Sequence, residues 1–354
     1  MATSISTRCS SARVCPESSM PDRRQARIAL IATGGTIAGA QTGELSGGYR
    51  AGALSVDTLL EAVPSLAGLA RVEPEQLVNV GSQNMSYAVW HALARRVDEL
   101  MRADDITGIV ITHGTDTLEE TAYFLSLVLP HTKPVVLVGA MRPATAMSAD
   151  GPRNIHSAVA VAVSPQSANR GPLVVMNDEV HYARHVQKMA CGGVDAFDSP
   201  NAGRAGVVRG SRVSFYGRAD IASAAADNVF PLSQLPATVW PRVEIAYACA
   251  DMDGLLIDFM ATHAQGIVLA GVGDGNATDA AVDAMMNASR SGVAVVRSTR
   301  TGSGSVGRNI EVDDDHGGFI AAYELNPQKA RVLLTLALMG KRDRAEIQAL
   351  FERY

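Results

Sequence analysis

The sequence predicts an α/β protein built on parallel sheets, and two features of its patterning support this prediction. Short, continuous apolar runs alternate with longer segments in which apolar residues recur with the 3.6-residue period of a helix. The run at 28–33 (IALIAT) stops at Gly34-Gly35, and the run at 106–112 (ITGIVIT) stops at a hydroxyl-rich loop. Continuous apolar runs are typical of parallel strands, which are buried on both faces. The alternation of strand and helix favours a doubly wound sheet.

The elements expected in the first part of the chain follow one another as strand, loop and helix. A helix is expected at 86–101, where Ser86 can cap the first turn. Another is expected at 117–129, with Thr117 and Glu120 as a capping-box pair. The remaining elements expected here are a strand at 134–139, a helix near 153–163 and a strand at 172–177.

The chain divides into two expected domains at a change in composition. Residues 217–240 contain Asp, Ser, Pro and Ala without a clear period and indicate a linker, after which the alternation restarts. Strands are expected at 243–248, 266–271 and 293–298, with helices at 253–264, 278–290 and 327–339. We therefore expect a larger, flavodoxin-like doubly wound domain at 27–216 and a smaller, Rossmann-like α/β domain at 241–354. Residues 1–26 lack the apolar core of a secretory signal and are expected to be a disordered tail.

The composition excludes several classes of function. Hydrophobic residues make up 47% of the 354 residues and charged residues 19%, as in ordinary globular proteins. A net charge of −5 without a basic stripe gives no reason to expect nucleic-acid binding, and no apolar run reaches the roughly 18 residues of a membrane span. The four cysteines, Cys9, Cys15, Cys191 and Cys249, lack metal-site spacing and are expected to be free thiols.

Two loops that follow strands are the candidate site. Residues 33–36 (Thr-Gly-Gly-Thr) follow the first strand, and residues 113–117 (His-Gly-Thr-Asp-Thr) follow the second. Doubly wound sheets bind ligands beyond the carboxyl ends of their strands, and glycines let the backbone approach a ligand closely. The second loop also opens a helix, where free N–H groups suit a carboxylate or an oxyanion. Helix capping alone would explain Thr117, and also Asp116, but not two such loops.

A threonine hydroxyl at these loops would need a partner to become a nucleophile. His113 is the first candidate base, although a histidine at the end of a strand is more often a packed residue. A lysine base would have to lose about three pKa units, or about 4 kcal/mol, to be neutral near pH 7. The spacing of the residues leaves both alternatives open.

Three further patterns suggest other chemistry. Gly302, Gly304 and Gly307 form a G-x-G-x-x-G motif, which would suit an NAD(P)-linked oxidoreductase if a helix followed it. The segment that follows does not predict a clear helix. The acidic run 313–316 (Asp-Asp-Asp-His) could bind a metal, but a solvated loop is the commoner arrangement. The segment 251–254 (Asp-Met-Asp-Gly) covers a fragment of a calcium loop and is interpreted as the start of a helix.

The two loops lie in segments that resemble the signatures of bacterial-type L-asparaginases. These segments are 31–40 (IATGGTIAGA) and 111–124 (ITHGTDTLEETAYF), and the similarity extends from about residue 27 to the C-terminus. It includes 78–86 (VNVGSQNMS) and 325–338 (LNPQKARVLLTLAL). The resemblance implies hydrolysis of the side-chain amide of L-asparagine to L-aspartate and ammonia, with a weaker action on glutamine and no metal or organic cofactor.

The resemblance also implies a role for each catalytic residue. Thr36 matches the nucleophile, and Tyr49 matches the lid tyrosine that assists it. Thr115 and Lys188 match the pair that activates the nucleophile or a water. Asp116 matches the carboxylate that holds the substrate ammonium. Lys188 is assigned by resemblance alone, since its own surroundings in the sequence predict a surface residue.

The remaining implied roles concern substrate binding and assembly. Ser82 and Gln83 match residues that hold the α-carboxylate and amino group of the substrate, and Glu311 matches an acidic residue contributed by a neighbouring subunit. The resemblance implies a homotetramer of dimers that share active sites. Asp251 stands where relatives have an amide, which could alter the preference between asparagine and glutamine. His131 replaces a cysteine that is bridged in secreted relatives, so we expect a cytoplasmic rather than a periplasmic protein.

A relative that binds amino acids but has lost catalysis is the remaining alternative. Such a protein would bind aspartate and release no ammonia. The presence of all the matched nucleophile, base and carboxylate positions argues against it.

Overall fold

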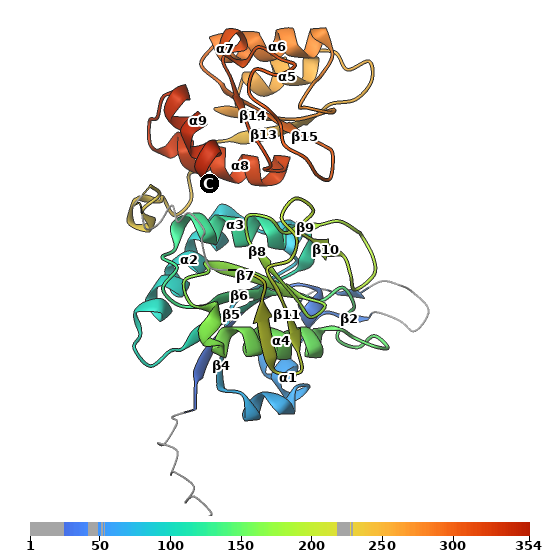
Figure 1. Ribbon diagram of the computed structural model, residues 1–354, viewed down its shortest axis with the longest axis vertical. Helices are drawn as coiled ribbons and strands as arrows, with labels where there is room; N and C mark the ends of the chain where they lie inside the picture. The colour runs from blue at the N-terminus through green and yellow to red at the C-terminus, as the bar shows by residue number, and fades with distance from the viewer. Residues whose placement is uncertain (1–24, 42–48, 51, 53, 218–226, 228) are drawn as a thin grey trace, which may run out of the picture.

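The computed structural model describes residues 25–41, 49, 50, 52, 54–217, 227 and 229–354. The chain forms a larger N-terminal domain and a smaller C-terminal domain, each built around its own sheet (Figure 1). Nearly all of the expected disordered tail, residues 1–26, lies outside the described residues, as do Cys9 and Cys15. Cys191 and Cys249, the two cysteines within the described residues, are exposed and unbridged.

The N-terminal sheet has the predicted doubly wound topology. Its strand order is β12-β11-β8-β7-β6-β5-β1-β4. The five parallel strands are β1 (Arg27–Gly34), β4 (Arg71–Val80), β5 (Gly108–Thr112), β6 (Val135–Val138) and β7 (Pro172–Met176). Numbered along the chain, they lie in the order 2-1-3-4-5, which is the flavodoxin-like arrangement. The antiparallel strands β8 (Glu179–Tyr182), β11 (Gly206–Arg209) and β12 (Arg212–Phe215) extend one edge.

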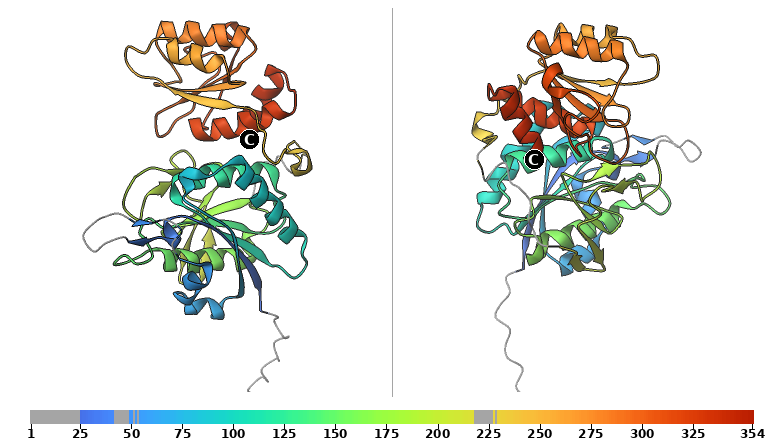
Figure 2. Two further views of the ribbon diagram at one scale, coloured as in Figure 1. Left: turned by 180° about the vertical axis from the view of Figure 1, so that it is seen from behind. Right: turned by 45° about the horizontal axis from the view of Figure 1, so that its top comes forward.

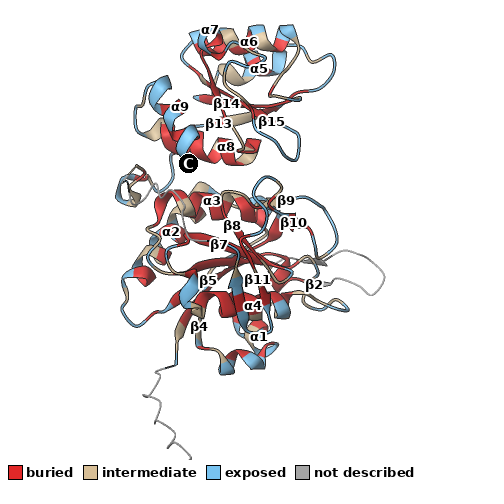
Figure 3. Ribbon diagram, viewed as in Figure 1, coloured by how far each residue is buried: buried red, intermediate tan, exposed pale blue. Residues whose placement is uncertain are grey.

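Helices cover both faces of this sheet, as Figure 2 shows. The face toward the C-terminal domain carries α2 (Tyr87–Arg102) and α3 (Leu118–Val128). The far face carries α1 (Val56–Glu61) and α4 (Gly151–Val163). Apart from the half-buried Arg27 at the start of β1, strands β1, β5, β6 and β7 are buried along their length (Figure 3), as their continuous apolar sequences predict.

The two predicted helix caps have different outcomes. The Ser86 side chain accepts a hydrogen bond from the Val89 amide and caps α2, as expected. The capping box of Thr117 and Glu120 is wrong, because the Thr117 side chain makes no cap bond to α3. A 3₁₀ turn at Thr115–Thr117 precedes the helix, and the Thr117 hydroxyl instead donates to the carbonyl of Ser82 at 2.8 Å. That hydroxyl therefore ties two loops together.

The C-terminal domain has a four-stranded parallel sheet whose strands lie in chain order. The strands are β13 (Val243–Tyr247), β14 (Gly266–Gly271), β15 (Ala294–Thr299) and β16 (Phe319–Ala321). Helices α5 (Leu255–Ala261) and α6 (Asp279–Arg290) pack on one face, and α8 (Pro327–Met339) packs on the other. The chain ends with α9 (Arg344–Arg353). The sheet and its helices agree with the predicted smaller α/β domain, although β16 and α9 were not predicted.

The acidic run 313–316 differs from the solvated loop that the sequence predicts. It forms the N-cap and most of a short helix, α7 (Asp314–Gly317), and Asp314 is fully buried. Its carboxylate receives two hydrogen bonds from the equally buried Arg297, at 2.6 and 2.8 Å. A buried carboxylate needs a paired cation, and that cation is distant in sequence.

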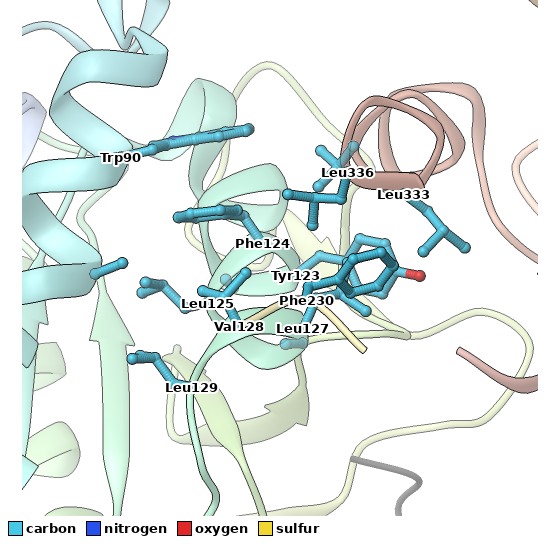
Figure 4. Close-up of a cluster of buried hydrophobic side chains, with 14 of the residues drawn as sticks. Trp90, Tyr123, Phe124, Leu125, Leu127, Val128, Leu129, Phe230, Leu333 and Leu336 are labelled. Carbon is cyan, nitrogen blue, oxygen red and sulfur yellow. The ribbon is translucent and has the colours of Figure 1, made fainter. Parts of the chain in front are cut away.

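Helix α8 joins the two domains through one continuous apolar cluster. Leu333 and Leu336 of α8 are buried on the side of that helix that faces Tyr123 and Phe124 of α3 (Figure 4). Phe124 in turn stacks on Trp90 of α2, with ring centroids 4.9 Å apart. Each fully buried leucine or phenylalanine stabilises the fold by about 1.5–3 kcal/mol relative to an exposed one. The relative position of the domains is therefore fixed by a packed core.

The described part of the segment 217–240 packs against the domains. Phe230 and Trp240 are buried, and Trp240 stacks on Tyr87 with ring centroids 4.5 Å apart. Among the described residues, no helix has the length and apolar character needed to cross a membrane.

Candidate active site

Three loops meet at the carboxyl ends of β4, β1 and β5. A Cβ atom on Gly35 would lie 2.3 Å from the Cα of Gly114, and a Cβ on Gly114 would lie 2.6 Å from the Ser82 hydroxyl oxygen. Gly35 also has φ = +88°, which favours glycine. The loops therefore touch through their backbones, and a side chain in place of either glycine would force them apart. Because β1 lies between β4 and β5, they meet at the switch point of the sheet, where such folds bind ligands.

Thr36 lies at the start of a 3₁₀ turn, Thr36–Ala38, directly after β1, and is 7% exposed. The preceding Thr33 hydroxyl donates to the carbonyl of Thr112 at 2.9 Å and ties the ends of β1 and β5 together. The Thr33 hydroxyl therefore has a structural role. Thr36, in contrast, follows Gly35, where the loops after β1 and β5 touch.

Lys188 joins Thr115 and Asp116 in one polar cluster. Its ammonium donates to the Thr115 hydroxyl at 2.9 Å and to the Asp116 carboxylate at 2.6 Å. Lys188 belongs to β9 (Gln187–Lys188), which pairs with β10 (Phe197–Asp198) in a short hairpin. The Lys188 side chain is 17% exposed and that of Asp116 is 56% exposed, so the carboxylate remains open to a ligand. An ammonium, a hydroxyl and an accessible carboxylate can shift a proton and hold a cationic group.

Ser82 lies on the other side of Asp116. It is buried in a 3₁₀ turn, Ser82–Asn84, and its hydroxyl accepts a hydrogen bond from the Asp116 amide at 3.2 Å. The neighbouring Gln83 is exposed. The structure thus brings Ser82, Thr115, Asp116 and Lys188 into one connected group.

Three other residues singled out in the sequence are not joined to this group by a described contact. Tyr49 lies in β3 (Tyr49–Arg50), whose backbone pairs with β2 (Ala40–Gln41), and its side chain falls outside the described residues. Glu311 lies in the C-terminal domain, where it accepts a hydrogen bond from Asn276 of the same chain. Asp251 is exposed in the loop after β13, with φ = +59°.

The sequence predicts that His113 is either a catalytic base or, more commonly, a packed residue, and the structure shows it packed just after the end of β5. It is fully buried, and its Nδ1 lies 2.7 Å from the Gly114 carbonyl, so this nitrogen carries the proton. Its Nε2 then accepts the Thr121 hydroxyl at 2.9 Å. Burial lowers the pKa of His113 from 6.5 to about 4, so the ring is neutral near pH 7. Both ring nitrogens are occupied, which leaves neither for Thr36.

Glu119 is a residue of this region that the sequence analysis did not single out. It is 3% exposed, and its carboxylate accepts the backbone amide of Lys188 at 2.6 Å. It also accepts hydrogen bonds from Asn326 at 2.8 Å and from Gln328 at 3.0 Å. The signal that could have revealed it was a pair of glutamates, Glu119 and Glu120, in the first turn of a largely apolar helix, because buried carboxylates require partners.

The glycine motif of Gly302, Gly304 and Gly307 lacks the context of a dinucleotide site. It follows β15, but no helix begins until Asp314, which is seven residues after Gly307. No phosphate could therefore lie at a helix N-terminus directly after these glycines. The described residues also contain no group of three metal-binding side chains.

Comparison with known proteins identifies the family. The model for "Asparaginase, N-terminal" matches residues 27–220, and that for "Glutaminase/Asparaginase C-terminal domain" matches residues 242–351. The chain belongs to the asparaginase family. The "Probable L-asparaginase periplasmic" of Haemophilus influenzae is 46% identical over 92% of this chain and 93% of its own length. The "L-asparaginase 2" of Escherichia coli is 45% identical, with the same shares of the two chains.

A solved asparaginase has the same fold. The crystal structure of the probable cytoplasmic L-asparaginase from Campylobacter jejuni has a TM-score of 0.88 and 42% sequence identity. The match covers 93% of this chain and 100% of that one. The architecture of both domains is therefore that of an L-asparaginase.

Proposed function

We propose that this asparaginase hydrolyses the side-chain amide of L-asparagine to L-aspartate and ammonia, with Thr36 as the nucleophile. The proposal rests on one observation above the others. The Lys188 ammonium lies 2.9 Å from the Thr115 hydroxyl and 2.6 Å from Asp116, and the loop that carries these two residues touches the Thr36 loop through Gly114 and Gly35. A threonine nucleophile needs a partner that takes up its proton, and Lys188 can do so, directly or through Thr115, once its ammonium has become a neutral amine.

The reaction is proposed to have two steps. The Thr36 oxygen attacks the amide carbon and loses its proton, with Tyr49 assisting from the lid. The oxyanion is held by backbone N–H groups, each worth about 3–4 kcal/mol. The C–N bond breaks as the nitrogen gains a proton and leaves as ammonia. Water, activated by Thr115 and Lys188, then cleaves the aspartyl ester. Direct attack on the amide by an activated water is the alternative order of events.

The substrate is proposed to be held by its α-amino and α-carboxylate groups. Asp116 would bind the ammonium, and its exposed carboxylate is accessible for this despite the contact with Lys188. Ser82 and Gln83 would bind the remaining polar groups, and Ser82 is fixed by the Asp116 amide. The segment 34–52, with seven glycines, is proposed from the sequence to close over the substrate and exclude water; residues 42–48 and 51 of it lie outside the described residues. No metal or organic cofactor has a step in this scheme.

The active assembly is proposed to be a homotetramer of dimers that share active sites. Glu311 would serve the site of a neighbouring copy, which agrees with its lack of any described contact to Lys188 or Thr115 in its own chain. Tyr247, Leu255 and Phe259 are 61%, 71% and 67% exposed on the C-terminal domain. Leu255 and Phe259 lie one turn apart on α5, and exposed apolar side chains of this size are typical of subunit contacts.

The domain limits and cellular location also remain proposals. We propose domains at 27–216 and 241–354, joined through 217–240. We propose a cytoplasmic location, because His131 stands at one position of the cysteine pair of secreted relatives.

An ammonia-release assay tests the proposed function. L-Asparagine, L-glutamine and their D-forms are each supplied to the full chain, and ammonia and aspartate are quantified. Release that is fastest from L-asparagine and weaker from L-glutamine is the expected result. Binding of aspartate without ammonia release would instead identify an amino-acid-binding relative. A fluorescence titration with NAD(P)H tests the oxidoreductase alternative, since only an NAD(P)-linked enzyme should bind this cofactor.

A further inference from the structure

Glu119 is a buried carboxylate that contacts both domains directly behind Lys188. One carboxylate oxygen accepts the backbone amide of Lys188 at 2.6 Å. The other accepts the side-chain amides of Asn326 at 2.8 Å and Gln328 at 3.0 Å, both from the C-terminal domain. The three bonds therefore connect the proposed catalytic lysine to the start of α8.

The strand that carries Lys188 has little support of its own. Strands β9 and β10 pair over only two residues each, and so short a ladder does not fix a backbone by itself. The C-terminal domain supplies a second contact, because the buried ammonium of Lys329 donates to the carbonyl of Val186. Thus α8 holds the segment 186–188 at two points, directly through Lys329 and indirectly through Glu119.

The start of α8 suits a carboxylate. Asn326 caps the helix through its side-chain oxygen, which accepts the Lys329 amide at 3.1 Å, and its side-chain nitrogen is thereby directed to Glu119. The positive end of the dipole of this 13-residue helix, together with the Lys329 ammonium, stabilises the buried negative charge. The Glu119 carboxylate is held from the C-terminal domain and in turn holds Lys188.

We infer that Glu119 is a positioning residue for Lys188, one that makes the placement of the lysine depend on the docking of the C-terminal domain. Glu119 fixes the backbone from which the Lys188 ammonium reaches Thr115 and Asp116. A misplacement of about 1 Å in a reacting group can reduce the rate about 100-fold. The inference rests on the proposed function, because Lys188 matters for rate only if the chain is a hydrolase.

The competing explanation is that Glu119 only balances the buried charge of Lys329. Removal of Glu119 would then lower stability without a specific effect on Lys188. Glu120 provides a matched control. It is the adjacent glutamate, also faces Arg331 and Lys329, and makes no described hydrogen bond to Lys188.

The test compares Glu119→Gln with Glu120→Gln in the full-length protein. The glutamine amide has only one acceptor oxygen, so it cannot accept both the Lys188 amide and the donors of α8. We therefore expect kcat to fall about 10- to 100-fold in Glu119→Gln, with KM changed less than about threefold. In Glu120→Gln we expect kcat within about twofold of wild type. Retention of wild-type kcat in Glu119→Gln overturns the inference. Equal losses in both variants, matching their losses of folded protein, also overturn it.

A second measurement reports the chemical reactivity of the Lys188 amine and does not depend on enzyme activity. Competitive acetylation with acetic anhydride, quantified by mass spectrometry with Lys133 as the internal reference, reports the environment of each ammonium. We expect the relative reactivity of Lys188 to change at least about threefold in Glu119→Gln and to stay constant in Glu120→Gln. Unchanged reactivity in both variants counts against positioning. If the wild type releases no ammonia, the proposed function fails and this measurement still decides the role of Glu119.

The variant Gln328→Ala replaces Glu119→Gln in this test if Glu119→Gln does not fold. It removes one donor to the Glu119 carboxylate without leaving the Lys329 charge unpaired. We expect a smaller decrease in kcat, about two- to fivefold, at unchanged KM and with the same direction of change in Lys188 reactivity. Wild-type values of both quantities in a folded Gln328→Ala protein would overturn the dependence on the C-terminal domain.

Discussion

A Cβ atom on Gly35 would lie 2.3 Å from the Cα of Gly114, so the loops after β1 and β5 are in backbone contact. Each glycine stands one position before a threonine of the proposed site, Thr36 and Thr115. The separation of the two threonines is therefore set by backbone that cannot move apart without breaking this contact.

Gly35→Ala is expected to damage both the site and its stability. The new methyl group must push the Gly114 loop away, and the φ of +88° adds backbone strain. We expect ammonia release to fall at least about 100-fold, because the two loops no longer align. Gly210→Ala is the control for strain alone, since Gly210 has φ = +61° and nothing within 4 Å of an added Cβ. It should cost about 1–2 kcal/mol of unfolding free energy and leave kcat unchanged. Normal turnover in Gly35→Ala would show that the loop contact is dispensable.

Thr36→Ala should abolish ammonia release and leave the fold intact. The variant removes one hydroxyl from a position after β1 and keeps the backbone of the 3₁₀ turn. Thr33→Ala is the matched control, because Thr33 lies three residues earlier and its hydroxyl only ties β1 to β5. That control should lose about 1 kcal/mol of stability and keep its turnover. Near-normal turnover in Thr36→Ala would eliminate Thr36 as the nucleophile.

Lys188→Met should lower kcat by orders of magnitude at a nearly unchanged melting temperature. Methionine retains the length and much of the apolar surface of the side chain, whereas the bonds to Thr115 and Asp116 are lost. Because the pair is partly exposed, its contribution to stability is small, about 0–1 kcal/mol. Lys133→Met, at a lysine that donates to the Ala103 carbonyl, is the control and should keep full activity. Ammonia release and circular dichroism melting measure the two quantities.

The sequence predicted the sheet and the two loops because these depend on local patterns. Continuous apolar runs mark the parallel strands, and the strand order then places the loops after β1 and β5 side by side. Lys188 could not be found in this way. It lies 72 residues beyond Asp116 in a two-residue strand, where no periodicity can develop, and resemblance alone suggested its role.

The partners of buried charges are the other feature that a sequence pattern does not predict. The sequence predicts a solvated loop around Asp314 and does not single out Glu119, because the partners of both carboxylates are distant in the chain. Arg297 lies 17 residues from Asp314, and Asn326 lies 207 residues from Glu119. Hydrophobic patterning predicts which faces are buried, but it does not show where a buried carboxylate finds its donors.

His113 is expected to make stability depend on pH below neutrality. Burial lowers its pKa from 6.5 to about 4, so the unfolded chain binds a proton more readily than the folded chain. The stabilising contribution is present above about pH 6.5 and is lost as the pH falls toward 4, up to about 3 kcal/mol. Urea unfolding of wild type and His113→Gln at several pH values gives the difference, in which other titrating groups cancel. The free-energy advantage of wild type over the variant should shrink as the pH falls; a constant difference would contradict the buried neutral ring.

The buried pair of Arg297 and Asp314 should contribute strongly to the stability of the C-terminal domain. Both side chains are 0% exposed, and Arg297 also donates to the carbonyls of Asp274 and Gly307 at 2.9 and 3.0 Å. Asp314→Asn leaves the guanidinium buried without a counter-charge, which typically costs about 3–5 kcal/mol. Denaturant unfolding, followed by circular dichroism, measures this loss.

Asp315→Asn is the matched control for this pair. Asp315 is the next residue, and it pairs with Arg308, but its side chain is 66% exposed. Water screens such a pair, so its loss should cost no more than about 1 kcal/mol. The double variant Arg297→Met with Asp314→Leu should recover much of the stability lost in Asp314→Asn, because no unpaired charge remains buried. Equal unfolding free energies for Asp314→Asn and Asp315→Asn would mean that water reaches the Arg297 guanidinium and that burial does not set the strength of this pair.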